Sequence, residues 1–366
     1  MNIDDIALTL QQGLGTKGIV WLLSVFGSAE AVFRASEPEL TEGAGLKPEL
    51  ARGLLKKNFH SQSEKELRYM ERNSLTGVSS TDPEYPGFLR ECPDYPHVLY
   101  VRGDVRALAG RMLSMVGTRT ITPYGQRMCD VLVGRMSELD RNLCVVSGLA
   151  YGVDGACHRA ALRYGLKTVA VIANPLPDIT PSQHRALAED IVQSGGAIVS
   201  ELHSQTKLNG SYFIPRNRII AGIGEGTVVV ESPSSGGSLS TAELAESYNR
   251  TVMAVPGRAG DRCSEGPNLL IKRRRAGMVT SGDDVFHEMG WDISTPGRVP
   301  RAAVHAPLLS AAEKRVVECF GEGEAVDVDT LALRSGTSVG ELAGILLSLE
   351  IGGVVRPLPG KIYEKI

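Results

Sequence analysis

The segment that begins at Phe213 combines an aromatic ring with two closely spaced cations. It reads Phe-Ile-Pro-Arg-Asn-Arg, so Arg216 and Arg218 follow Phe213 at what the pattern predicts to be the start of a helix. Guanidinium groups bind phosphates and a neighbouring ring can stack on a base, a combination typical of single-stranded nucleic-acid binding. The alternative is a structural helix start whose arginines pair with Glu201 or Glu231.

Three further turns each follow a short apolar run and are rich in glycine. In an open parallel sheet such turns lie at the carboxyl ends of the strands, where backbone N–H groups and helix N-termini bind phosphates. Together with the arginine segment they supply the candidate nucleic-acid-binding residues. These are Gly117, Thr118 and Arg119 after one strand, Ser147 and Gly148 after another, Gly236, Gly237 and Ser238 in a serine-rich loop, and Lys207, Phe213, Arg216, Asn217 and Arg218.

The serine-rich loop also supports an enzymatic alternative. Its sequence Gly-Gly-Ser-Leu-Ser-Thr-Ala-Glu, from Gly236 to Glu243, is similar to the loop of nucleotide phosphoribohydrolases, although a proline and a third glycine of that pattern are absent. Such an enzyme would place Glu243 and Asp154 against a ribose. Asp154 and His158 are one helical turn apart, which indicates either an acid–base pair or, as we favour, a hydrogen-bonded pair that fixes the start of a helix.

Six short apolar runs are expected to form the strands that position these turns. They are continuous rather than alternating, as strands buried on both faces require, and they alternate with helical patterns. The central region, residues 76–293, is therefore predicted to be an α/β domain with an extended Rossmann-like, doubly wound parallel sheet. The runs lie at 112–116, 144–147, 168–172, 197–200, 227–230 and 252–255.

Two smaller domains are predicted to flank the sheet. Residues 1–75 show helical spacing broken by glycines, which favours a helix-hairpin-helix (SAM-like) domain or, alternatively, a small helical bundle whose glycines only cap helices. Residues 294–307 have the composition of a linker. Residues 308–366 begin with a capping box at Ser310 and Glu313, and three helices near 310–320, 328–335 and 338–350 and a hairpin predict a winged-helix domain.

The winged-helix domain is not expected to read DNA bases. Its candidate recognition helix, residues 338–349, carries Glu341 and no Lys or Arg, so a major groove would set a carboxylate against phosphates. A role in protein contacts or regulation is the better expectation for this domain, and a sequence-specific transcription factor is the weaker alternative.

The composition limits the class of protein. A chain of 366 residues with 42% hydrophobic and 22% charged residues is typical of globular domains, and no apolar run approaches the roughly 18 residues needed to cross a bilayer. Since the first residues do not resemble a signal peptide, we expect a cytoplasmic protein without a membrane partner. The six cysteines lack the spacing of a metal site, and neither a metal nor a cofactor is expected.

The net charge of −3 conceals an uneven distribution. Residues 102–288 hold 21 Lys and Arg against 18 Asp and Glu, whereas residues 308–366 hold 6 against 9. A central domain with an excess of three positive charges is compatible with a nucleic-acid partner, and the overall charge does not exclude one.

Taken together, these motifs resemble the DNA-processing protein A family (DprA, also called Smf). The resemblance implies a bacterial, non-enzymatic protein that binds single-stranded DNA without sequence preference. It also implies a homodimer that protects incoming DNA during natural transformation and loads the RecA recombinase onto it. By motif position, Arg119, Phe213, Arg216, Arg218 and the 236–238 loop would line the DNA site. The motifs lie at 115–119, 146–154, 213–222, 237–239, 254–257 and 266–271.

The chain departs from the family pattern at two places. Residues 174–181 replace a glycine that is usually followed by Tyr-Pro. Arg274 and Arg275 replace the Gly-Ala that usually follows the Asn-x-Leu-Ile motif, and they extend a basic run that begins at Lys272. Such a run is typical of a solvated helix surface, although it can also add charge for a DNA backbone.

Overall fold

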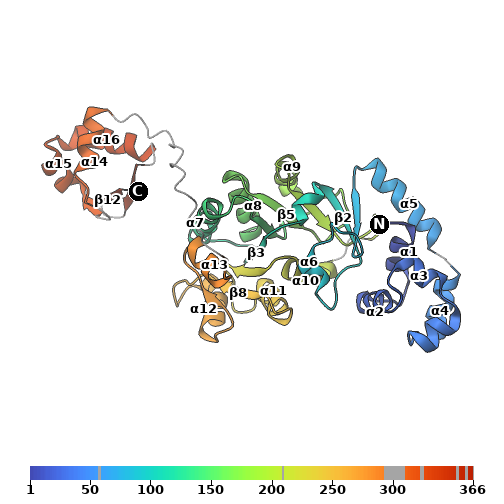
Figure 1. The fold of residues 1–366 in the computed structure, drawn as a ribbon. Coiled ribbons are helices and arrows are strands. Elements are labelled where there is room, and N and C mark those ends of the chain that lie inside the picture. Colours follow the sequence, from blue (N-terminus) through green and yellow to red (C-terminus); the bar gives the residue numbers. More distant parts are fainter. Residues whose placement is uncertain are drawn as a thin grey trace. The chain divides into compact units, whose positions relative to one another are not determined.

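The computed structural model describes residues 1–56, 59–207, 210–291, 310–321, 325–351, 354–358 and 362–365. The chain divides into two compact units, Met1–Ser294 and Thr295–Ile366 (Figure 1). Each unit has a hydrophobic core of its own. The predicted linker, residues 294–307, lies outside the described residues.

The larger unit is built on a nine-stranded sheet with the order β1-β2-β6-β5-β4-β3-β7-β8-β9. All neighbours from β6 to β9 are parallel. The predicted α/β fold with a doubly wound parallel sheet is thereby confirmed, with β1 and β2 added as an antiparallel edge that the apolar runs did not indicate. The strands are β1 (Thr76–Ser79), β2 (Val98–Gly103), β3 (Met112–Val116), β4 (Cys144–Ser147), β5 (Lys167–Val171), β6 (Ala197–Ser200), β7 (Gly226–Val229), β8 (Thr251–Ala254) and β9 (Gly277–Met278).

The order of the strands creates a switch point between β3 and β7. The chain moves outward from β3 through β4 and β5 to β6, then crosses back and continues from β7 on the other side of β3. The connections that leave β3 and β7 therefore run to opposite faces of the sheet. A crevice opens at the carboxyl ends of the strands at such a point, which is where open α/β sheets bind ligands.

Helices cover both faces of this sheet (Figure 1). Buried residues of α7, α8 and α13 form one core cluster with the strands, and those of α6, α10, α11 and α12 form another. The helices are α6 (Gly87–Arg90), α7 (Pro123–Leu139), α8 (Val153–Arg163), α9 (Arg185–Gln193), α10 (Phe213–Ile223), α11 (Gly237–Ser247), α12 (Glu265–Lys272) and α13 (Gly282–Glu288).

The first part of the chain is helical, as predicted, and packs directly on the edge of the sheet. Ile6 of α1 and Met70 of α5 share a core cluster with Val98 and Tyr100 of β2. The boundary at residue 75 and the helix-hairpin-helix assignment stay predictions. The helices are α1 (Ile3–Leu10), α2 (Thr16–Phe26), α3 (Ala29–Arg34), α4 (Pro48–Leu55) and α5 (His60–Arg72).

The smaller unit combines three helices with a three-stranded antiparallel sheet of order β10-β12-β11. The predicted capping box is present, since Ser310 and Glu313 bond each other's backbone N–H groups. The helices are α14 (Ala311–Glu318), α15 (Val328–Ser335) and α16 (Val339–Ile351), and the strands are β10 (Ala325–Asp327), β11 (Val355–Leu358) and β12 (Ile362–Lys365). Among the described residues of the whole chain, no helix is long and apolar enough to span a bilayer.

The departure at Arg274 falls on a backbone position that favours glycine. Arg274 follows the C-cap of α12 with a φ of 56°, in the left-handed region. Its N–H donates to Ile271 O at 2.9 Å and the N–H of Arg275 donates to Leu270 O at 2.9 Å, the pair of bonds that defines a Schellman motif. A side chain at this position strains the backbone.

We expect Arg274→Gly to stabilise the larger unit by about 1 kcal/mol, because the strain at a left-handed position disappears. Both tryptophans of the chain, Trp21 and Trp291, lie in this unit, so tryptophan fluorescence during urea unfolding reports on it. Arg273→Gly is the matched control. Arg273 has a φ of −84°, and glycine there loses more conformational entropy on folding without relieving strain. Equal shifts of both variants would contradict the explanation.

Candidate nucleic-acid interface

A cleft of about 260 Å³ lies at the switch point, and we call it the switch-point cleft. The loops after β3 and β7 and the first turns of α10 and α11 line it. Nine of the thirteen candidate residues meet here, although they come from three separate parts of the chain. These nine are Gly117, Thr118, Arg119, Phe213, Arg216, Asn217, Gly236, Gly237 and Ser238.

The loop after β3 is pinned between the loop after β7 and the start of α8. Thr118 N donates to Glu231 O at 2.6 Å, and Thr118 O accepts from Val153 N at 3.1 Å. A Cβ on Gly117 would lie 2.5 Å from the Val153 side chain and 2.7 Å from Glu231 O. Only glycine therefore fits at this close approach, which leaves Arg119 at the exposed tip of the loop.

Arg119 is exposed at the cleft and lies beside the half-buried Phe213. The Arg119 Cζ atom lies 5.3 Å from the centroid of the Phe213 ring, a cation–π contact that fixes the ring and the cation next to each other. No carboxylate of the described residues forms an ion pair with Arg119. Ile214 is 69% exposed beside this pair. The sequence reasoning missed it, because only the structure shows that this apolar side chain is exposed.

Arg216 lies in the floor of the cleft. Its side chain is only 5% exposed, and its Nη1 donates to Gly148 O at 2.8 Å and to Val171 O. Burial lowers the pKa of Arg216 to about 10, while the nearby Asp154 carboxylate acts in the opposite direction, so the guanidinium stays protonated near neutral pH. A Cβ on Gly148 would lie 2.3 Å from Arg216 Nη1, which explains the glycine there. Gly148 thus shapes the floor through its backbone.

Three candidate residues point elsewhere. Arg218 pairs with Glu201, and both side chains are largely buried, so the structural alternative holds for this arginine. Lys207 is exposed but lines a different cleft, together with Arg218. Ser147 Oγ is buried and donates to Met115 O at 2.6 Å. The structure does not bring these three side chains to the switch-point cleft.

The start of α11 supplies backbone donors. Gly236 is the N-cap in an extended conformation, and among the residues that the structure describes no side chain caps this helix. The first N–H groups of a helix have no acceptor within it, and the helix dipole places positive partial charge there. Because Gly237 and Ser238 line the cleft, this helix start and Arg119 present donors suited to a phosphate in the same crevice.

The predicted hydrogen-bonded pair of Asp154 and His158 is absent, and this expectation was wrong. Asp154 accepts from Ala150 N at 3.3 Å and lies beside Arg216, whereas His158 Nδ1 lies 2.7 Å from Thr168 Oγ1. The Thr168 hydroxyl donates to a strand carbonyl, so His158 donates to Thr168. The helix start is held by the loop that precedes it, and His158 is fully buried and does not line the cleft.

The carboxylates do not form a ribose site. Glu243 is not among the residues that line the cleft; its side chain is 60% exposed and lies 3.6 Å from Arg275. Asp154 is the only carboxylate among the described lining residues, and burial raises its pKa while Arg216 opposes the shift. The described geometry therefore gives no support to the phosphoribohydrolase alternative.

Two family models match the chain. The model described as DNA recombination-mediator protein A matches residues 76–290, and the DprA winged helix domain matches residues 300–361. The fold and the cleft thus define a Rossmann-like protein with an appended winged helix.

Curated relatives and solved structures agree with these models. Protein Smf of Escherichia coli is 33% identical over 303 residues, which cover 81% of this chain and 79% of that protein. DNA processing protein DprA of Streptococcus pneumoniae is 36% identical over 218 residues, or 60% of this chain and 76% of the relative. The chain belongs to the DprA/Smf family.

Two solved structures share the fold. An X-ray structure of DprA from Streptococcus pneumoniae superposes with a TM-score of 0.67 and 30% identity, covering 79% of this chain and 98% of that one. A structure that concerns the single-stranded DNA binding mode of DprA from Helicobacter pylori has a TM-score of 0.52 and 25% identity, covering 58% of this chain and 94% of the other.

The buried histidine beneath the site makes stability depend on pH. Burial lowers the pKa of His158 to about 3, and the neighbouring His184, Arg159 and Arg216 act in the same direction. His158 Nε2 is buried and has no hydrogen-bond partner among the described residues, so a proton there would be an uncompensated charge. The folded state binds this proton more weakly than the unfolded state, for which the pKa is about 6.5.

We therefore expect this contribution to stability to be complete above pH 6.5 and to be lost as the pH falls toward 3. The slope should be about 1.4 kcal/mol per pH unit within that window. Urea unfolding of His158→Gln, followed at several pH values, should show a slope that is smaller by this amount. The same substitution at the exposed His287 is the control. An unchanged slope in His158→Gln would contradict the assignment.

Proposed function

We propose that this protein binds single-stranded DNA without sequence preference in the switch-point cleft. The observation that carries the proposal is Arg119, an exposed cation with no carboxylate partner in the described part of the chain, placed over Phe213 at a cleft that also receives the start of α11. Membership of the DprA/Smf family and the likeness to the Helicobacter pylori protein, whose structure concerns single-stranded DNA binding, support it.

Some groups in the cleft contact phosphates and others contact bases. Arg119 and the N–H groups of Gly237 and Ser238 contact phosphates, while Phe213 offers a ring face to a base. Arg216 makes no exposed contact, and because Asp154 lies beside it as a counter-charge, its part is to hold the floor of the cleft in place. Since none of these groups has to meet a base edge, every sequence binds in the same way, and affinity falls steeply with salt.

The family supports a wider role. We infer a DNA-processing function in natural transformation, in which a cytoplasmic homodimer covers incoming single strands and loads RecA onto them. We also infer that the protein acts by binding and not by catalysis, because the cleft offers Asp154 beside Arg216 and no second described carboxylate.

Titration of labelled oligo-dT at several salt concentrations tests the binding site. We expect Phe213→Ala to cost about 1–3 kcal/mol of binding free energy if a base stacks on the ring. Arg119→Ala should weaken binding equally for all sequences and reduce the slope of log K against log salt by about 0.7, the value for one phosphate of a single strand.

Arg106→Ala is the matched control for the loss of one exposed arginine. Arg106 is 86% exposed, pairs with Asp104 and does not line the cleft, so its removal should leave affinity unchanged. Equal affinity of the wild-type protein for single and double strands, or no affinity for either, would refute the proposed function.

Nuclease protection and RecA assembly test the wider role. We expect the wild-type protein to slow the digestion of single strands and to speed their coating by RecA, and Arg119→Ala to lose both effects in proportion to its lost affinity. Sedimentation of the free protein checks the dimer. DNA binding with no effect on RecA coating would remove RecA loading from the proposal while leaving DNA binding in place.

A further inference from the structure

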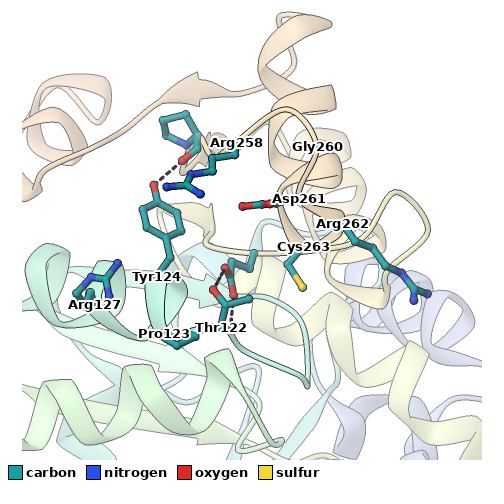
Figure 2. Close-up of a pocket in the computed structure, with 12 residues that line it drawn as sticks. Thr122, Pro123, Tyr124, Arg127, Arg258, Gly260, Asp261, Arg262 and Cys263 are labelled. Carbon is teal, nitrogen blue, oxygen red and sulfur yellow. Dashed lines mark hydrogen bonds between the residues drawn. The ribbon is translucent and has the colours of Figure 1, made fainter. Parts of the chain in front are cut away.

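A second and larger cleft adjoins the switch-point cleft. It has a volume of about 900 Å³ and lies between the start of α7 and the segment 256–263 that follows β8 (Figure 2). We call it the β8 cleft. None of the candidate residues lines it, and the proposed function has not used it.

Three arginines of the β8 cleft are exposed. Arg127, Arg258 and Arg262 form no ion pair with any described residue, whereas Arg135 of α7 pairs with Asp283 on the same helix layer. An arginine held without a partner keeps its full bidentate donor capacity for a ligand.

The β8 cleft holds fewer carboxylates than arginines among its described lining residues. Glu231 is 2% exposed, and its two oxygens accept from Thr122 N at 2.9 Å and from Thr122 Oγ1. Asp261 is the one exposed carboxylate among the described lining residues. The three exposed guanidinium groups therefore outnumber the two carboxylates, of which one is buried, and the cleft favours an anion.

The walls of the β8 cleft are held in place before any ligand binds. Tyr124 donates its hydroxyl proton to Pro256 O, which ties the start of α7 to the segment after β8 and leaves the ring along the wall (Figure 2). Gly257 exchanges two hydrogen bonds with the Asn268 side chain, at 3.1 and 3.0 Å. A ligand therefore meets a preformed surface that includes an aromatic ring.

The loop after β3 separates the two clefts and forms a wall of each. Its residues 117–119 line the switch-point cleft and Thr122 lines the β8 cleft. Ser232 N donates to Cys263 O at 2.7 Å, so the segment with Arg262 lies against the loop that leads to Gly236. Figure 2 shows Arg262 extending beyond Cys263, away from Arg127 and Arg258.

We propose that the β8 cleft binds a further stretch of the same DNA strand, continuing from the switch-point cleft across the loop after β3. This rests on the proposed function. A free nucleotide concentrates its charge on one phosphate and needs donors that converge, whereas Arg262 points away from the other two arginines (Figure 2). Separated guanidinium groups match the successive phosphates of a chain, and Tyr124 offers a ring for a base.

The triple variant Arg127→Ala, Arg258→Ala, Arg262→Ala tests this extension. We compare it with the wild-type protein on oligo-dT of about 6 and about 16 nucleotides, within the range of single-strand site sizes. Affinity for the long strand should fall on the order of 10- to 100-fold at ~0.1 M salt, and the salt slope should fall by about 2, because three phosphate contacts are lost. Affinity for the short strand should stay unchanged.

The triple variant Arg34→Ala, Arg68→Ala, Arg106→Ala is the matched control. It removes the same charge from exposed arginines that line neither cleft, each of which pairs with a carboxylate. Its binding to both strands should equal that of the wild-type protein. Should the test variant not fold, Arg258→Glu alone, at an exposed position, should show the same selective loss for the long strand.

Each further outcome overturns the extension. Unchanged affinity of the test variant for the long strand, or an equal loss for short and long strands, would place the DNA outside the β8 cleft. Saturable binding of thymidine monophosphate that the test variant loses would mark a free-nucleotide site instead. If the wild-type protein binds neither strand, the proposed function itself is wrong. This result differs from the three outcomes above, in which the wild-type protein binds DNA or thymidine monophosphate.

Discussion

The guanidinium of Arg216 holds together the loops that form the site. It comes from the first turn of α10, reaches under the loop after β4 to bond Gly148 O, and bonds Val171 O at the end of β5. A buried cation is stable only where such acceptors and a counter-charge surround it, and Asp154 is that counter-charge. Loss of one partner of a buried pair costs about 3–5 kcal/mol, so α10, α8 and two strand ends are fixed relative to one another. Phe213 lies one turn before Arg216 on α10, so its position is fixed as well.

Because Arg216 is anchored in this way, the arginines of the site differ in what they contact, and the sequence did not show which arginine is exposed. Arg216 and Arg218 stand two residues apart at a helix start, and residues at that spacing face different directions. Arg216 therefore points toward the carboxyl ends of β4 and β5, and Arg218 points toward Glu201. Arg119, from a distant loop, is the exposed cation. The residue types and the strand ends were readable from the sequence, but the rotation of α10 about its axis depends on packing against the sheet and was not.

The fold shows the same difference between features that the sequence pattern indicates and features that depend on packing. Strands β3 to β8 were predictable because burial on both faces demands continuous apolar runs, and their carboxyl ends identified the loops. The edge strand β1 reads Thr-Gly-Val-Ser, with Val78 as its one aliphatic side chain, and β9 has two residues, so neither forms an apolar run. Strand β10 likewise has three residues and is defined by its pairing with β12. Arg274 was visible as a departure from the family pattern, yet its positive φ follows from the Schellman motif of α12 and only the structure displays it.

The attraction of a charged ligand depends on how charges are distributed around the binding cleft and not on the net charge of the protein. Arg275 of the basic run pairs with Glu246, and Arg163 pairs with Asp130, so these cations are satisfied within the surface. Around the carboxyl ends of β3, β7 and β8, by contrast, four arginines have no carboxylate partner among the described residues: Arg119, Arg127, Arg258 and Arg262. A chain with a net charge of −3 can therefore attract a polyanion to one edge of its sheet, because field strength at a cleft depends on the nearest uncompensated charges. Charges that lie more than about 10 Å from the cleft are screened at 0.1 M salt and contribute little to that balance.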